Sequence, residues 1–75
     1  MAGKDAAPVA VAVIGGGFIA DYHVNGIRAA GGAEVAALVS RSAANAARRS
    51  AELGVPRWET DYRQVLADPT IDAVV

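Results

Sequence analysis

The fold depends first on Val9-Ala-Val-Ala-Val-Ile14, an apolar run that leads directly into Gly15-Gly-Gly17-Phe-Ile-Ala20. Valine and isoleucine favour a strand that is buried on both faces. Gly15 permits a tight turn out of this strand, Gly17 leaves room for a phosphate beside the backbone, and Ala20 lets the next helix pack closely. The first backbone N–H groups of that helix and its dipole attract an anion. The segment therefore indicates a binding site for the pyrophosphate of a dinucleotide.

The surroundings of the glycine motif support this interpretation. Glycine-rich turns also occur as plain loops, so the motif alone leaves a purely structural turn open. Here a strand precedes the motif, a helical pattern follows over 18–30, and a second strand over Ala33–Val39 completes the unit. The unit is about 30 residues long, as a dinucleotide-binding fingerprint requires.

Helix-ending and helix-capping residues divide the middle of the chain. Gly31 and Gly32 are expected to end the first helix, because glycine is favoured just beyond a helix terminus. Ser42 is placed to cap a second helix over Ala43–Leu53. Gly54 is expected to end that second helix.

The remainder of the chain predicts two strands and a brief helix. Pro56 cannot donate a hydrogen bond to a ladder, so a strand over 55–59 belongs at a sheet edge. Asp61 is expected to cap a helix over 62–67, and a further strand begins over 71–75.

This alternation predicts an α/β fold with a parallel sheet and right-handed crossovers. The expected strand order is 3-2-1-4 with the first strand central, a partial doubly wound (Rossmann) fold whose ligand lies between the first and fourth strands. Residues 1–8 are interpreted as a flexible leader, and 9–75 as the N-terminal part of a dinucleotide-binding domain, its second half and a substrate domain being absent. A chain of 75 residues buries only about 60% of its unfolded surface, so marginal stability is expected.

Two helix faces are predicted to pack on the sheet. In the first helix, Ile19, His23 and Ile27 recur four residues apart and share one face. His23 is therefore interpreted as a packed, hydrogen-bonded residue, with a role as an acid or base as the alternative. In the second helix the predicted face is a stripe of small residues, namely Ala44, Ala47 and Ala51.

The composition excludes several classes of function. Seven basic and eight acidic residues are scattered along the chain and give a net charge of −1, so no nucleic-acid partner is predicted. Cysteine is absent, which excludes disulfides and thiolate sites, and no metal site is predicted. Lys4 and the following apolar residues resemble a signal peptide, but Asp5 and the glycines interrupt the pattern. The apolar run is too short to span a bilayer, so a cytoplasmic protein without a membrane partner is predicted.

Ser40 and Arg41 follow the second predicted strand, where a dinucleotide site places the group that selects the cofactor. An NAD site usually has an acidic residue here, about 20 residues after the glycines, which binds the ribose 2′-hydroxyl. Arg41 offers instead a permanent cation whose fork matches a phosphate. The pair therefore favours NADP, with NAD still possible, and argues against FAD and S-adenosylmethionine. The alternative is that Ser40 helps to cap the next helix and Arg41 is solvated.

Other charged residues receive structural interpretations. Asp21 lies in the first turn of a helix, where a surface carboxylate suits the helix dipole. Arg48, Arg49 and Glu52 are interpreted as the solvated face of the second helix, and Asp72 as the start of the last strand.

Four segments together resemble the N-terminal domain of the family of glucose–fructose oxidoreductase, inositol dehydrogenase and MocA (Gfo/Idh/MocA). These segments are VAVIGGGFIADYH at 11–23, LVSR at 38–41, YRQVLADP at 62–69 and IDAVV at 71–75. The glycine motif is widely shared among nucleotide-binding proteins, whereas the spacing of all four segments is more specific.

The resemblance implies NAD(P)-dependent oxidation of a sugar or polyol hydroxyl, or the reverse carbonyl reduction. The catalytic residues of such enzymes lie in segments that this chain does not contain, so no catalytic residue is expected here. Gly16 departs slightly from the family motif and is expected to loosen the phosphate loop. Oligomers in this family usually form through the second domain, so an oligomer is compatible with the resemblance. The residues expected to bind the cofactor are Gly15, Gly16, Gly17, Phe18, Ile19, Ser40 and Arg41.

A binding module without redox chemistry is the alternative function. A CoA-binding or ligand-sensing Rossmann domain needs only the glycine turn, because one fold can carry unrelated functions.

Overall fold

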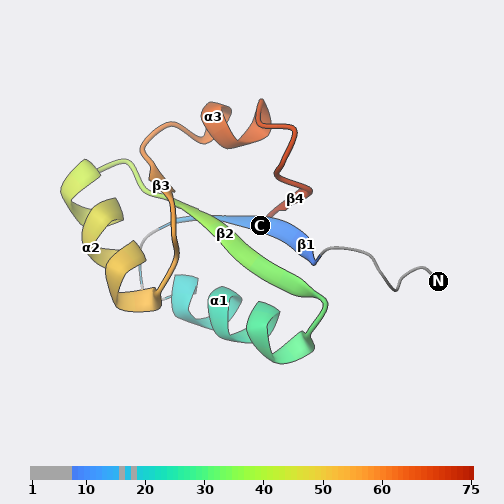
Figure 1. Cartoon of the computed structure of the whole chain (residues 1–75). Helices are drawn as coiled ribbons and strands as arrows, with labels where there is room; N and C mark the ends of the chain where they lie inside the picture. Colours follow the sequence, from blue (N-terminus) through green and yellow to red (C-terminus); the bar gives the residue numbers. More distant parts are fainter. Residues whose placement is uncertain (1–7, 16, 18) are drawn as a thin grey trace.

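A computed structural model describes residues 8–15, 17 and 19–75 of the chain. The predictions for Gly16, for Phe18 and for residues 1–7 of the leader over 1–8 lie outside the described residues. The chain forms a parallel sheet with helices on both faces (Figure 1). In this described part, none of the helices has the length and apolar character of a membrane span.

The sheet has four strands in the order β3-β2-β1-β4, which confirms the predicted arrangement with the first strand central. β1 (Val9–Ile14) and β2 (Ala33–Val39) form its long inner pair. β3 (Trp58–Glu59) and β4 (Ala73–Val74) are short strands at the two edges. All three pairings are parallel, so the carboxyl ends of the strands point to the same side of the molecule.

β3 is shorter than the predicted strand over 55–59, although its edge position is confirmed. Val55 is buried in the core, and its N–H group donates to the carbonyl of Ser50 at 2.8 Å. This contact belongs to the end of a helix, so Val55 does not join the ladder. Pairing with β2 begins only at Trp58.

β4 is also shorter than predicted, and a side chain completes its attachment to β1. Asp72 lies one residue before the strand, and its N–H group donates to the carbonyl of Ala10 at 2.8 Å. The carboxylate of Asp72 accepts the N–H group of Ala10 at 2.9 Å. A side chain thus replaces a backbone carbonyl in the ladder between these two residues.

The three helices are α1 (Ile19–Ala30), α2 (Ala43–Leu53) and α3 (Tyr62–Leu66). α1 ends directly before Gly31 and Gly32, whose φ angles are 74° and 72°, so the predicted end of this helix is confirmed. Such positive angles strain any residue with a side chain.

The predicted caps of the later helices are confirmed as well. The hydroxyl of Ser42 accepts the N–H group of Asn45 at 3.2 Å, and Gly54 ends α2 in the left-handed conformation with a φ of 68°. The carboxylate of Asp61 accepts the N–H group of Arg63 at 2.9 Å at the start of α3.

The predicted packing face of α1 is wrong by one position. Ala20 and Val24 are fully buried and Ile27 is partly buried, whereas Ile19 is 53% exposed and His23 is exposed. The stripe that begins at Ile19 and the stripe that begins at Ala20 both include Ile27, and residue spacing alone does not show which stripe packs on the sheet. The stripe that begins at Ala20 packs on the sheet, because a small residue at the start of α1 permits the helix to approach β1 closely. His23 is therefore not a core residue.

The predicted packing face of α2 is wrong in a similar way. Ala46 and Ser50 are buried, Ala47 is half-buried, and Ala44 and Ala51 are exposed. The hydroxyl of Ser50 donates to the carbonyl of Ala47 at 3.0 Å, so a serine can be buried here without an unpaired polar group.

The helices and the sheet enclose a core on each face. α1 and the end of α2 cover one face, and α3 covers the other (Figure 1). The core under α1 and α2 is formed by Val13, Ala20, Val24, Val35, Leu38 and Val55, with Ile27 and Leu53 packed against it. The core under α3 is formed by Ala12, Ala37, Val39 and Val65, with Ile71 and Val74 packed against it.

Candidate cofactor-binding site

The carboxyl ends of β1, β2 and β3 are aligned at one edge of the sheet. Ile14 lies opposite Val39, and Val39 lies opposite Glu59. The chain leaves these three strands at Gly15, Ser40 and the loop before α3. In open parallel sheets ligands bind outside this edge, so the alignment brings the loops of a potential site together.

A hollow of about 510 Å³ lies between these loops, on the β2 side of β1. Its described lining contains no residue of β4, so it does not coincide with the predicted ligand position between the first and fourth strands. A volume of this size is within the range of about 300–1,000 Å³ that is typical of small-molecule sites. Its lining combines an apolar floor at the strand ends with polar groups from the loops and from α2. The described residues that line it are Ile14, Gly15, Val39, Ser40, Arg41, Ser42, Asn45, Thr60 and Tyr62.

Gly15, at the start of the glycine turn, lines the hollow, whereas the predicted site residue Gly17 is not among its described lining residues. Gly15 has a φ of 116°, an angle that a residue with a side chain adopts only under strain, and its N–H group donates to the carbonyl of Val39 at 2.7 Å. The carbonyl of Gly17 accepts the N–H group of Ala20 at 3.0 Å, which joins the turn to the start of α1. A Cβ atom added to Gly17 would meet nothing within 4 Å. The space beside Gly17 is thus open to a ligand atom, as a phosphate-binding turn requires.

Ser40 connects the sheet to the first turn of α2. Its N–H group donates to the carbonyl of Glu59 at 3.0 Å, and its hydroxyl accepts the side-chain amide of Asn45 at 3.0 Å. The hydroxyl that caps α2 is that of Ser42. Ser40 is half-buried and lines the hollow, so a capping role does not account for its position.

Arg41 is exposed and also lines the hollow. No ion pair involves Arg41 among the residues that the structure describes. No acidic residue is among the described residues of the lining. A positive charge without a neighbouring carboxylate favours the approach of an anion to this side of the hollow.

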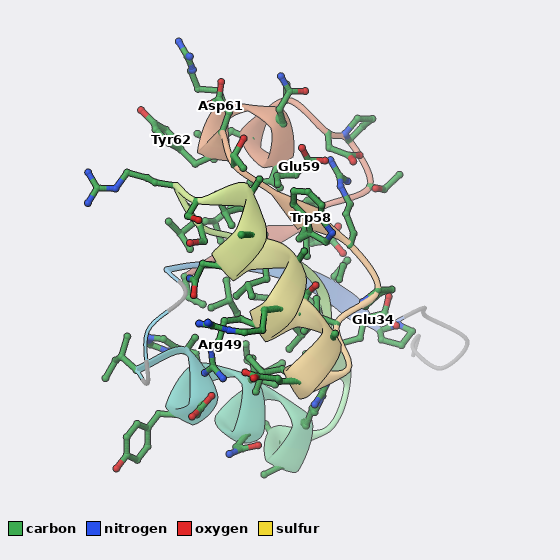
Figure 2. All side chains as sticks on the ribbon, turned by 90° about the vertical axis from the view of Figure 1, so that its left-hand side faces the viewer. Glu34, Arg49, Trp58, Glu59, Asp61 and Tyr62 are labelled. Carbon is green, nitrogen blue, oxygen red and sulfur yellow. The ribbon has the colours of Figure 1, made fainter. Side chains whose placement is uncertain are left out.

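The two acidic residues that flank the lining residue Thr60 in the sequence each form an ion pair with an arginine. Glu59 accepts a hydrogen bond from Arg57 at 3.0 Å, and Asp61 accepts one from Arg63 at 2.9 Å. Figure 2 shows Asp61 beside Tyr62 at the start of α3, and Glu59 near Trp58. The hydrogen bonds from Arg63 lower the pKa of Asp61. These ion pairs reduce the negative potential that an anionic ligand would meet.

Arg49 departs from its predicted solvated role, whereas Asp21 lies in the first turn of α1 with its side chain 43% exposed, as predicted. The two side chains form an ion pair between α2 and α1, and Arg49 also pairs with Glu52 at 2.7 Å. The side chain of Arg49 is only 16% exposed, and Figure 2 shows it between the two helices. The pair places a positive charge beside the carboxylate in the first turn of α1, and thereby offsets its repulsion of an anion at the glycine turn.

Six of the described lining residues were not among the predicted cofactor-binding residues, namely Ile14, Val39, Ser42, Asn45, Thr60 and Tyr62. Thr60 and Tyr62 follow β3, and the rule that parallel strands end at a common edge would have indicated them once β3 was placed beside β2. Asn45 lies in the first turn of α2 and reaches Ser40 only through the packing of that helix, so no local pattern marks it. Of the predicted residues, Ile19 and His23 are exposed on α1 and are not among the described lining residues.

Comparison with known proteins places this geometry in a family. Residues 9–75 match the profile of GFO_IDH_MocA, an oxidoreductase family with an NAD-binding Rossmann fold. The chain belongs to this family. The resemblance noted from four segments of a Gfo/Idh/MocA domain is thereby confirmed.

One relative was found by similarity of sequence. The 4-carboxy-2-hydroxymuconate-6-semialdehyde dehydrogenase of Sphingobium sp. (strain NBRC 103272 / SYK-6) is 32% identical over 65 residues, which are 87% of this chain and 21% of that protein. The chain therefore spans about a fifth of the length of this relative.

Solved structures of several dehydrogenases and oxidoreductases share the fold. An NAD-binding oxidoreductase from Klebsiella pneumoniae is 29% identical with a TM-score of 0.82, covering 91% of this chain and 20% of that one. A levoglucosan dehydrogenase in complex with NADH and levoglucosan is 25% identical with a TM-score of 0.81, covering 89% and 20%. A scyllo-inositol dehydrogenase from Lactobacillus casei with NAD(H) and scyllo-inositol is 25% identical with a TM-score of 0.73, again covering 89% and 20%.

Proposed function

We propose that this chain binds the adenosine and pyrophosphate half of NADP or NAD in an oxidoreductase. The hollow at the ends of β1 and β2 carries this proposal, since it brings Gly15 together with the guanidinium of Arg41, which forms no ion pair within the described part of the chain. The pyrophosphate would lie at the glycine turn and the adenosine ribose beside Ser40 and Arg41. The seven predicted cofactor-binding residues keep these roles in the proposal, Gly16 and Phe18 included.

NADP is the preferred cofactor in this proposal, and NAD is a second cofactor that the site can bind. Arg41 supports the preference, because a guanidinium fork matches the oxygens of a 2′-phosphate and cannot replace the carboxylate of an NAD site. The complexes of the levoglucosan and scyllo-inositol dehydrogenases contain NADH and NAD(H), which supports a nicotinamide dinucleotide in general.

The reaction that we propose is oxidation of a sugar or polyol CH–OH group, or reduction of the corresponding carbonyl. Two structural relatives were solved with levoglucosan and with scyllo-inositol bound, and these ligands support this class. We assign no catalytic residue to this chain. We infer that residues 9–75 form the first part of a cofactor domain, and that the substrate domain belongs to the part of the relatives that this chain does not span.

Calorimetric titration of the intact protein with NADPH, NADH and CoA tests the proposal. NADPH is expected to bind most tightly, NADH more weakly, and CoA not measurably. Arg41→Gln should reduce the affinity for NADPH by about tenfold, the weight of one hydrogen bond to a charged group, and should leave NADH nearly unchanged. Binding of CoA without a response to either nicotinamide cofactor would favour a non-redox module instead.

A further inference from the structure

Three side chains form a hydrogen-bonded series that ends at the hollow. A guanidinium nitrogen of Arg48 donates to the side-chain oxygen of Asn45 at 2.6 Å, and the amide nitrogen of Asn45 donates to the hydroxyl of Ser40 at 3.0 Å. Arg48 lies on the exposed side of α2, whereas Asn45 and Ser40 are half-buried and line the hollow. The series thus links a surface charge to a hydroxyl at the candidate ribose site.

The chemistry of the three groups fixes the direction of each bond. A guanidinium only donates, so the oxygen of the Asn45 amide must face Arg48. The NH₂ group of the same amide must then face Ser40, whose oxygen accepts in this contact. The single proton of the Ser40 hydroxyl is consequently directed elsewhere.

The Ser40 proton is available to a ligand. In the ranges 8–15, 17 and 19–75, no hydrogen bond donated by the Ser40 hydroxyl is recorded, while the residue lines the hollow. The oxygens of a 2′-phosphate are charged acceptors. A hydrogen bond from a hydroxyl to a charged acceptor is stronger than one to a neutral group. A ribose 2′-hydroxyl is neutral and both donates and accepts, so it gains less from a donor that is oriented in advance.

We propose that Asn45 is a positioning residue which makes Ser40 a hydrogen-bond donor to the 2′-phosphate and so raises the preference for NADP over NAD. This inference rests on the proposed function of the same site. Arg48 contributes by holding the Asn45 amide in the required orientation. Neither Asn45 nor Arg48 needs to touch the cofactor for this effect.

A double-mutant cycle on the intact protein tests whether Asn45 acts through Ser40. Calorimetry would measure 2′,5′-ADP and 5′-ADP, which share the adenosine but differ in the 2′-phosphate. Asn45→Ala is expected to weaken 2′,5′-ADP by about fivefold to tenfold, the effect of one ordinary hydrogen bond, because Ser40 itself remains, and 5′-ADP by less than about twofold. In the background of Ser40→Ala, the substitution of Asn45 should have no further effect on either ligand.

Two further variants separate orientation from charge and from folding. Asn45→Asp turns the donor into an acceptor and should reverse the Ser40 hydroxyl, which lowers the ratio of 2′,5′-ADP to 5′-ADP affinity further than Asn45→Ala. Ala44→Asp is the matched control, because it adds the same charge on an exposed position of the same turn and should change the ratio less. Arg48→Met releases the amide without altering a lining residue, and should reduce the 2′,5′-ADP affinity in the same direction by a smaller factor.

The outcomes distinguish the two proposals. A wild-type protein that binds neither ligand overturns the proposed function and this inference with it. A wild-type protein that prefers 2′,5′-ADP, but in which Asn45→Ala has the same effect with and without Ser40, leaves the proposed function intact and refutes the role of Asn45. An equal change of the ratio by Ala44→Asp and Asn45→Asp also refutes it, because charge alone would then explain the result.

Discussion

The two faces of the sheet are stabilised in different ways. The face under α1 and α2 buries the larger side chains, with Leu38, Val13 and Val24 fully inaccessible. The face under α3 buries two alanines of the strands, and of its large residues only Val65 is fully buried. On this second face, polar contacts supplement a smaller core, since Arg57 pairs with Asp68. Since Arg49 and Asp21 also form an ion pair between the helices of the first face, the two faces differ chiefly in the size of their apolar cores.

The largest expected effect comes from the core under α1 and α2. Leu38→Ala removes a fully buried side chain of β2 and should destabilise the protein by about 2–5 kcal/mol, the range for buried leucine. Urea unfolding followed by the fluorescence of Trp58, the single tryptophan, would measure it. A loss below about 1 kcal/mol would contradict the view that this core dominates.

The matched substitution on the other face should cost less. Val65→Ala removes the buried valine of α3, and the loss of two methyl groups corresponds to about 1.6 kcal/mol before any cavity term. The same unfolding experiment would measure it. If Val65→Ala proved as costly as Leu38→Ala, the proposed difference between the two faces would be wrong.

The charge on the α3 face should make stability depend on pH. Hydrogen bonds from Thr70 and from Arg57 lower the pKa of Asp68 to about 2. The pKa in the unfolded chain is about 3.9, so the ionised carboxylate stabilises the fold above that pH, and this stabilisation is lost as the pH falls from about 4 to 2. Asp68→Asn should therefore be less stable than wild type at pH 6 and equal to it below pH 2, with a smaller effect than Val65→Ala at every pH.

A matched variant checks the cause of this dependence. Thr70→Val removes the hydroxyl that donates to Asp68 at 2.7 Å and should raise the pKa of that carboxyl. Titration of the carboxyl carbon by NMR would measure the shift. An unchanged pKa in Thr70→Val would show that the Thr70 hydroxyl does not contribute.

The smallest effect is expected from the ion pair between α1 and α2. Arg49→Gln removes the contacts with Asp21 and Glu52 and should lower stability slightly, less so at high salt, because screening weakens partly exposed pairs. Arg48→Gln is the control, since the side chain of Arg48 is 65% exposed. Equal effects of the two substitutions would show that burial of Arg49 between the helices adds nothing.

Much of the fold could be predicted because its signals are local. Gly31, Gly54 and Ser42 mark helix ends by backbone conformation or capping, which depend on a few neighbouring residues. The strand order followed from the alternation of elements and the right-handed crossover rule. In the candidate site, the positions of Gly15 and Ser40 at adjacent strand ends followed from the same topology.

The chain's own residues thus specified the sequence of elements, the glycine turn and the place of Arg41 after β2, since each depends on short-range chemistry or on a general rule of handedness. The side of each helix that packs, the pairing of Arg49 with Asp21, and the contact of Asn45 with Ser40 emerged only in the assembled molecule. These features depend on how closely α1 and α2 approach the sheet. That distance is set by side chains that are remote in sequence, such as Ala20 and Val55, and that share one core cluster only after folding.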